Sequence, residues 1–106
     1  MYLNDYQAHA LEYAVYPKEH GVTYTMMGLC SETGEVADKI KKAMRDGWPP
    51  LMLREEVKKE LGDVLWYVAA LAKEFDLKLM DVGVGNIAKL NDRHIRNKLN
   101  GSGDNR

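Results

Sequence analysis

Apolar residues recur at helical spacing through most of this 106-residue chain, and the strongest pattern is a pair of apolar stripes on two long segments, at about residues 23–45 and 51–75. The first stripe contains Leu29, Val36, Ile40 and Ala43, and the second contains Leu53, Val57, Leu61, Val64, Val68, Leu71 and Phe75. No segment alternates apolar and polar residues as a half-buried strand does. The pattern predicts an all-α fold, a bundle of four or five helices in which the two long helices are antiparallel.

The expected helix ends come from capping residues and helix breakers. Asn4 or Asp5 is expected to cap a first helix, which ends at about residue 16 because a proline and a glycine follow. Gly47 suits the left-handed position after the first long helix. Asp81 is expected to cap a fourth helix that runs to about residue 98, and the glycine-rich residues 99–106 form a polar tail. We expect a single domain over the whole chain.

Composition describes an ordinary globular protein. Lys and Arg number 15 against 16 Asp and Glu, and the resulting net charge of −1 argues against a nucleic-acid or anionic-membrane surface. Neither a signal peptide nor an apolar run of the roughly 20 residues that a membrane span needs is visible. Cys30 is the single cysteine, so we expect a buried free thiol in a reducing compartment, and we expect the protein to be cytoplasmic.

One short acidic pattern occurs twice, once in each long helix. Glu32 and Glu35 stand three residues apart, as do Glu60 and Asp63, and in both copies a glycine lies between the acids and a valine follows them. Residues three apart are neighbours on a helix surface, so each pair occupies one face. Packing of the two stripes is expected to bring the four carboxylates together. The glycines lower helix propensity, and they fit either close helix packing or room for a metal ion and its waters.

Four carboxylates at one site repel one another and require a compensating cation. Oxygen ligands of this kind suit Mg²⁺, or Mn²⁺ in its place, and the chain has neither a Glu-x-x-His pair for di-iron nor a Cys/His cluster for zinc. Because Mg²⁺ held by a few carboxylates commonly takes phosphates as further ligands, the pattern indicates phosphoryl or nucleotidyl chemistry. The plainer alternative is a set of solvated acids beside lysines such as Lys39, Lys42 and Lys58.

The expected fourth helix carries a polar row that suits phosphate. Asn86, Lys89 and Arg93 share one side of it, and a basic row with an amide donor binds phosphate oxygens, although such a row also occurs as a plain solvated face. Among the aromatic residues, Tyr67 is favoured for stacking on a base because it falls on the same helix side as Glu60. The long apolar stripes and the methionines exceed what so small a bundle covers, so we expect a homodimer.

Together these motifs resemble the MazG-like, all-α nucleoside triphosphate pyrophosphohydrolases, in particular their small phage and bacterial members. The resemblance rests on Glu32-x-x-Glu35, 24 intervening residues and Glu60-x-x-Asp63, on Gly28-Leu29 and Arg45-Asp46, and on the run Glu60-Leu61-Gly62-Asp63-Val64-Leu65-Trp66-Tyr67. It extends through Asn86-x-x-Lys89-Leu90-x-x-Arg93 and the last six residues, and so covers residues 24–106.

The resemblance implies Mg²⁺-dependent hydrolysis of (d)NTPs to the monophosphate and pyrophosphate, by attack of a metal-activated water on the α-phosphorus. It also implies a homodimer or a dimer of dimers. The residues that it assigns to the metal and to catalysis are Glu32, Glu35, Glu60 and Asp63, one glutamate orienting or deprotonating the attacking water. The residues that it places at the substrate's phosphate or sugar are Asn86, Lys89 and Arg93.

The chain departs from the family pattern at two positions. Ser31 stands where many relatives have a second glutamate before Glu32, which leaves the number of metal ions open. Asn97 replaces a glycine that relatives often have, which leaves the path of the tail open. The alternatives are a hydrolase of the same fold for dUTP, dCTP, or modified or alarmone nucleotides, and a helical dimer that binds a nucleotide or a protein without hydrolysis. DNA binding is the weakest alternative, since basic residues are few and no helix-turn-helix pattern stands out.

Overall fold

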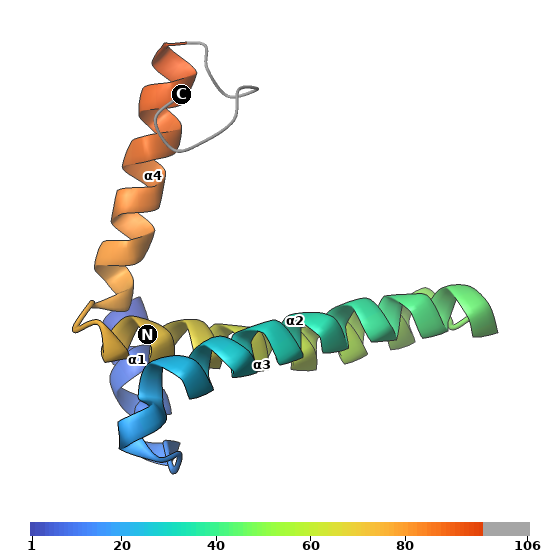
Figure 1. Cartoon of the computed structure of the whole chain (residues 1–106). Helices are drawn as coiled ribbons and strands as arrows, with labels where there is room; N and C mark the ends of the chain where they lie inside the picture. Colours follow the sequence, from blue (N-terminus) through green and yellow to red (C-terminus); the bar gives the residue numbers. More distant parts are fainter. Residues whose placement is uncertain (97–106) are drawn as a thin grey trace.

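The computed structural model describes residues 1–96, which form four α-helices and two short 3₁₀-helices and contain no strand. The elements, in chain order, are α1 (Leu3–Ala10), η1 (Leu11–Tyr13), η2 (Lys18–His20), α2 (Gly21–Asp46), α3 (Pro50–Glu74) and α4 (Leu79–Ile95). The predicted all-α fold is confirmed. α2 and α3 are the two carboxylate-bearing helices, and they lie side by side in opposite directions (Figure 1). The predicted polar tail and Asn97 lie outside the described residues.

The connection between the long helices follows local sequence signals. Gly47 adopts a left-handed conformation with φ of 65°, and its amide donates to the carbonyl oxygen of Ala43 over 2.8 Å. Pro50 is the first residue of α3, where the missing N–H of proline leaves no helix hydrogen bond unmade. These features turn the chain sharply, so that α3 runs back along α2.

Several predicted helix ends and one predicted burial differ from the structure. α1 ends at Ala10 rather than near residue 16. Of its two predicted capping residues, Asp5 accepts a hydrogen bond from the Tyr2 amide over 3.1 Å at the start of α1, whereas Asn4 accepts one from the amide of Met80 at the start of α4. Asp81 lies in the first turn of α4, whose capping position is Lys78. Cys30 is exposed within one chain, so its predicted burial is not found.

The most deeply buried side chains of α2 and α3 are small ones. Thr25, Ala69 and Ala70 are fully buried, and the Thr25 hydroxyl donates to the carbonyl oxygen of Gly21 over 2.7 Å. Small residues allow close approach of the two helices, but they leave larger side chains of both stripes partly uncovered. Leu61 remains 52% exposed and Phe75 60% exposed. Within one chain the apolar stripes are therefore only partly buried.

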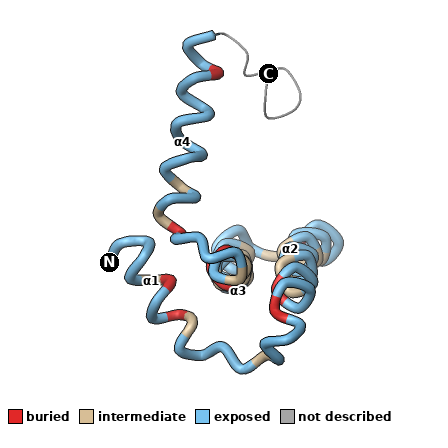
Figure 2. The backbone as a smooth tube through the Cα atoms, turned by 60° about the vertical axis from the view of Figure 1, so that its left-hand side comes forward, coloured by how far each residue is buried: buried red, intermediate tan, exposed pale blue. Residues whose placement is uncertain are grey.

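A buried glutamine joins α1, α3 and α4. The Gln7 amide nitrogen donates to the carbonyl oxygens of Ala69 and Leu77, both over 3.1 Å, and its amide oxygen accepts from the Leu79 N–H over 3.0 Å. The Trp66 indole donates to the carbonyl oxygen at the end of α1 over 2.9 Å. The buried positions of α1 and of the base of α4 lie next to α3 (Figure 2). These polar contacts fix the direction in which α4 leaves α3.

α4 projects away from the α2–α3 pair and contacts the remaining helices through α1 and α3 near its base (Figure 1). The radius of gyration is 16.6 Å, against about 13 Å for a compact chain of this length. The exposed apolar residues of α4 are Val82, Val84, Ile87, Leu90 and Ile95. No helix among residues 1–96 combines the length and the apolar character needed to cross a membrane.

Candidate metal and nucleotide site

Three of the four predicted acids converge between the long helices. Glu32 of α2 and Glu60 and Asp63 of α3 each offer a carboxylate oxygen, and these oxygens lie within 4.8 Å of one another. We call these three residues the carboxylate cluster. Glu35, the fourth predicted acid, is exposed one turn further along α2 and lies outside the cluster. The two-helix packing predicted from the apolar stripes thus brings the acids of both motifs to one place.

The glycines inside the two motifs leave open space. A Cβ atom added at Gly34 or at Gly62 would meet no described atom within 4 Å. Contact between α2 and α3 therefore does not require these glycines. Of the two readings left open by the sequence, room beside the carboxylates agrees better with this geometry than close packing within one chain.

The cluster is electrostatically unfavourable without a cation. Burial raises the pKa of Glu32, and the negative charges of Asp63, Glu60 and Glu35 raise it further. A divalent cation among these oxygens would remove the repulsion. Three carboxylates at this spacing are hard oxygen donors, which fits Mg²⁺ or Mn²⁺ better than a softer metal ion.

A lysine lies against the cluster. Lys39 Nζ is 3.2 Å from Glu56 Oε2 and 4.0 Å from Glu60 Oε1. The hydrogen bond to Glu56 raises the pKa of Lys39, and the bonds from Lys39 and Lys59 lower the pKa of Glu56. Sequence reasoning named Lys39 as a neighbour of solvated acids and did not name Glu56. A signal was present, since Glu56 precedes Glu60 by four residues and so shares its helix face.

Tyr67 lies one turn beyond Asp63 and forms the wall of a small cavity. The residues that line this cavity of about 290 Å³ are Tyr24, Met27, Gly28, Ser31 and Tyr67. The ring of Tyr67 lies against Gly28, where the lack of a side chain makes room for it. Burial raises the pKa of the Tyr67 hydroxyl, and the neighbouring Tyr24, Glu32 and Asp63 raise it further. The cavity therefore adjoins the carboxylate cluster.

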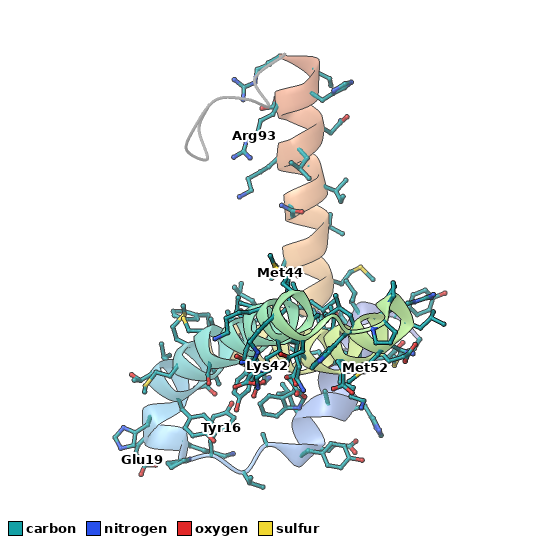
Figure 3. The ribbon with its side chains drawn as sticks, turned by 90° about the vertical axis from the view of Figure 1, so that its right-hand side faces the viewer. Tyr16, Glu19, Lys42, Met44, Met52 and Arg93 are labelled. Carbon is teal, nitrogen blue, oxygen red and sulfur yellow. The ribbon has the colours of Figure 1, made fainter. Side chains whose placement is uncertain are left out.

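The predicted phosphate-binding row does not reach the cluster within one chain. Asn86 and Lys89 are exposed on α4, and Arg93 is buried near the end of the helix furthest from α2 and α3 (Figure 3). Figures 1 and 3 both show α4 rising away from the pair that holds the acids. Within one copy of the chain, the polar row of α4 and the carboxylate cluster, which the sequence predicts to form one site, therefore lie apart.

The fold and this acidic site define a class: an all-α protein with a carboxylate cluster between two antiparallel helices. The model of the MazG nucleotide pyrophosphohydrolase domain matches residues 21–96, which is the span from the start of α2 to just beyond α4. The Gene 37 protein of Mycobacterium phage L5 is 42% identical over 114 residues, with 100% of both chains covered. No solved structure matches the chain. The chain belongs to the MazG nucleotide pyrophosphohydrolase family, as predicted from its motifs.

Proposed function

We propose that this protein hydrolyses (d)NTPs to the monophosphate and pyrophosphate in a Mg²⁺-dependent reaction. The observation that carries the proposal is the convergence of Glu32, Glu60 and Asp63 within 4.8 Å of one another on a MazG domain. A bound Mg²⁺ would neutralise phosphate charge and increase the acidity of a coordinated water, and Mn²⁺ would serve in its place. The three carboxylates would hold the ion.

Glu35 is the glutamate that we assign to the attacking water. It lies outside the carboxylate cluster, yet it is close enough for its charge to raise the pKa of Glu32. An exposed carboxylate in this position can accept a proton from water and aim its oxygen at the α-phosphorus. Pyrophosphate then leaves from the opposite side. Positioning and electrostatics supply most of the rate in phosphoryl transfer generally, which suits a site made of acids on two helices.

The cavity at Tyr67 is the proposed place for the nucleoside. It adjoins the carboxylate cluster, and its volume of about 290 Å³ is close to the lower end of typical small-ligand pockets. Tyr24 and Tyr67 provide aromatic faces, with ring centroids 6.5 Å apart, on which a base can stack. A triphosphate with its base in this cavity extends its phosphates toward Glu32 and Asp63.

A second copy of the chain would complete the phosphate site. Asn86, Lys89 and Arg93 suit phosphate oxygens, but α4 carries them away from the cluster of its own chain. The exposed apolar residues of α4 and the partly uncovered stripes of the long helices supply the surface for such an association. In a homodimer or a dimer of dimers, α4 of one copy would lie over the carboxylates of another.

The activity is tested with the common NTPs and dNTPs and with dUTP, each with Mg²⁺, with Mn²⁺ and with EDTA. Pyrophosphate and orthophosphate are quantified separately. We expect metal-dependent pyrophosphate with little orthophosphate. Orthophosphate alone would contradict the proposal, because it means attack at the terminal phosphorus. Nucleotide protection against thermal unfolding without any product would favour a helical dimer that binds nucleotides and does not cleave them.

The shared site is tested by mixing two inactive variants. Glu60→Gln removes a carboxylate of the cluster, and Lys89→Ala removes a positively charged side chain from α4. If α4 acts on the partner copy, each mixed dimer keeps one intact site, so refolding the two variants together restores about a quarter of the wild-type activity. If α4 serves its own chain, the mixture stays inactive.

A further inference from the structure

Lys39 is placed against the carboxylate cluster, and the reaction proposed above does not use it. Its Nζ lies 3.2 Å from Glu56 Oε2 and 4.0 Å from Glu60 Oε1. The three side chains are well shielded, with exposed fractions of 24%, 24% and 16%. The contact crosses from α2 to α3, so α2 contributes both an acid, Glu32, and a cation to one patch.

The position of Lys39 differs from that of other lysines on the same helix. Lys42 Nζ pairs with Asp38 of its own helix at 2.8 Å, and its side chain is 42% exposed. Lys39 instead reaches across to α3, where Glu56 holds it. Glu56 also accepts a hydrogen bond from Lys59 over 3.2 Å, which fixes the orientation of its carboxylate. Lys39 is thus anchored at its far end, with its charge directed at Glu60.

We propose that Lys39, anchored by Glu56, is a positioning residue of the metal site, which holds the Glu60 carboxylate in place and weakens the uptake of divalent cations by the cluster. The inference rests on the proposed function, because it concerns the same site. A fixed positive charge about 4 Å from a ligand oxygen offsets part of the repulsion among the acids and opposes an incoming cation. It thereby takes the role that a second metal ion would otherwise have.

This role predicts a single strong metal site per chain. Ser31 occupies the position before Glu32, where it adds no further carboxylate, and Lys39 cancels one negative charge on the Glu60 side. The cluster then keeps enough negative charge for one divalent ion. Removing the lysine charge should strengthen metal binding, whereas a lysine that only joins the two helices would have no such effect.

The test is a calorimetric titration of the nucleotide-free protein with Mg²⁺ and with Mn²⁺. Lys39→Met removes the charge and keeps the chain length, Lys39→Arg keeps the charge, and Lys42→Met is the matched control on the same helix. We expect Lys39→Met to bind the ions about tenfold more tightly, or to bind a second ion. Lys39→Arg and Lys42→Met should stay within about twofold of the wild type. Thermal unfolding in EDTA checks the fold of each variant.

Three results would overturn the inference. If Lys39→Met binds metal as the wild type does, or more weakly, and only its melting temperature falls, Lys39 is an ion pair between helices and nothing more. An increased KM for the nucleotide with unchanged metal affinity would assign Lys39 to the substrate. A wild-type protein that neither binds metal nor hydrolyses nucleotides would refute the proposed function itself, and this inference with it.

Discussion

Gly28 lies directly against the ring of Tyr67, and a Cβ atom at position 28 would overlap three atoms of that ring. Tyr67 in turn packs edge-to-face on Trp66, with ring centroids 5.0 Å apart, and faces Tyr24. The close approach of the α2 backbone to this aromatic ring explains why α2 has a glycine at position 28. It also sets the width of the cavity beside the carboxylate cluster.

Gly28→Ala should therefore destabilise the protein and weaken substrate binding. The ring of Tyr67 has to move, and overpacking of this kind costs about 1–3 kcal/mol. Gly34→Ala is the matched control on the same helix, since its added methyl group would meet no described atom within 4 Å. It should stabilise the protein by about 1 kcal/mol through helix propensity. Urea unfolding compares the two, and equal effects would show that Tyr67 does not depend on Gly28.

Glu60→Gln should reduce turnover by more than about 100-fold while the helical content stays unchanged. The substitution removes one negative charge of the carboxylate cluster and keeps the size of the side chain. Glu55→Gln, at an exposed position of α3, serves as the control and should keep wild-type activity. Circular dichroism and steady-state kinetics give the two readouts. Wild-type turnover in Glu60→Gln would remove this residue from the proposed site.

Glu32→Gln should stabilise the protein in EDTA at pH 7. The pKa of Glu32 is raised in the folded state, chiefly by burial and then by the neighbouring acids, so its charged form opposes folding. Relief of like-charge repulsion is worth about 0.5 kcal/mol, which corresponds to an increase of about 2–4 °C in melting temperature. The difference should vanish below about pH 4.5, the ordinary value for this carboxyl, and grow as the pH rises through the raised pKa.

Added Mg²⁺ should make the wild type more stable than Glu32→Gln, the reverse of the order in EDTA. In the proposed site the ion binds the folded protein, so the wild type should gain stability, and Glu32→Gln should gain less because it lacks one of the three carboxylates. Melting curves at several pH values, with Mg²⁺ and with EDTA, measure both effects. A variant that is less stable than the wild type in EDTA at pH 7 would contradict the repulsion that we infer within the cluster.

Gln7→Leu should destabilise the protein by about 2–4 kcal/mol. It leaves the carbonyl oxygens of Ala69 and Leu77 and the N–H of Leu79 without their partner in a buried position, and each such loss is costly. Asn4→Ala removes only an exposed capping hydrogen bond at α4 and should cost about 1 kcal/mol. Chemical denaturation separates the two, and similar values would mean that Gln7 does not join the helices as the structure indicates.

The sequence was sufficient to predict the two long helices and part of the site. Helical periodicity located both long helices, Gly47 marked the end of α2, and one acid of the first motif meets both acids of the second because the two helices pack along their apolar stripes. Periodicity identifies the residues that share one helix face. It does not give the offset between α2 and α3 along their axes, which decides which acid of one helix lies opposite the acids of the other. Glu35 therefore could not be separated from Glu32 by pattern, although only Glu32 reaches the cluster.

Other features depend on contacts between segments that are distant in sequence. Gln7 is polar and was not expected in the interior, yet it satisfies three backbone groups that no local pattern reveals. The hydrogen bonds of Gln7 set the direction of α4. The distance of Arg93 from the acids therefore could not be predicted from the sequence pattern either. Lys39 carried a weak signal, but its pairing across to Glu56 required the register between α2 and α3.

Hydrolysis in ¹⁸O-labelled water tests the central claim most directly. The reaction is run with the preferred nucleotide and Mg²⁺, with an EDTA control. The products are separated, and their masses are measured by mass spectrometry. We predict one ¹⁸O atom in the nucleoside monophosphate, none in the pyrophosphate, and no reaction in EDTA, because the proposed reaction is a metal-dependent attack of water on the α-phosphorus. Label in pyrophosphate or orthophosphate, or turnover that persists in EDTA, would contradict the account.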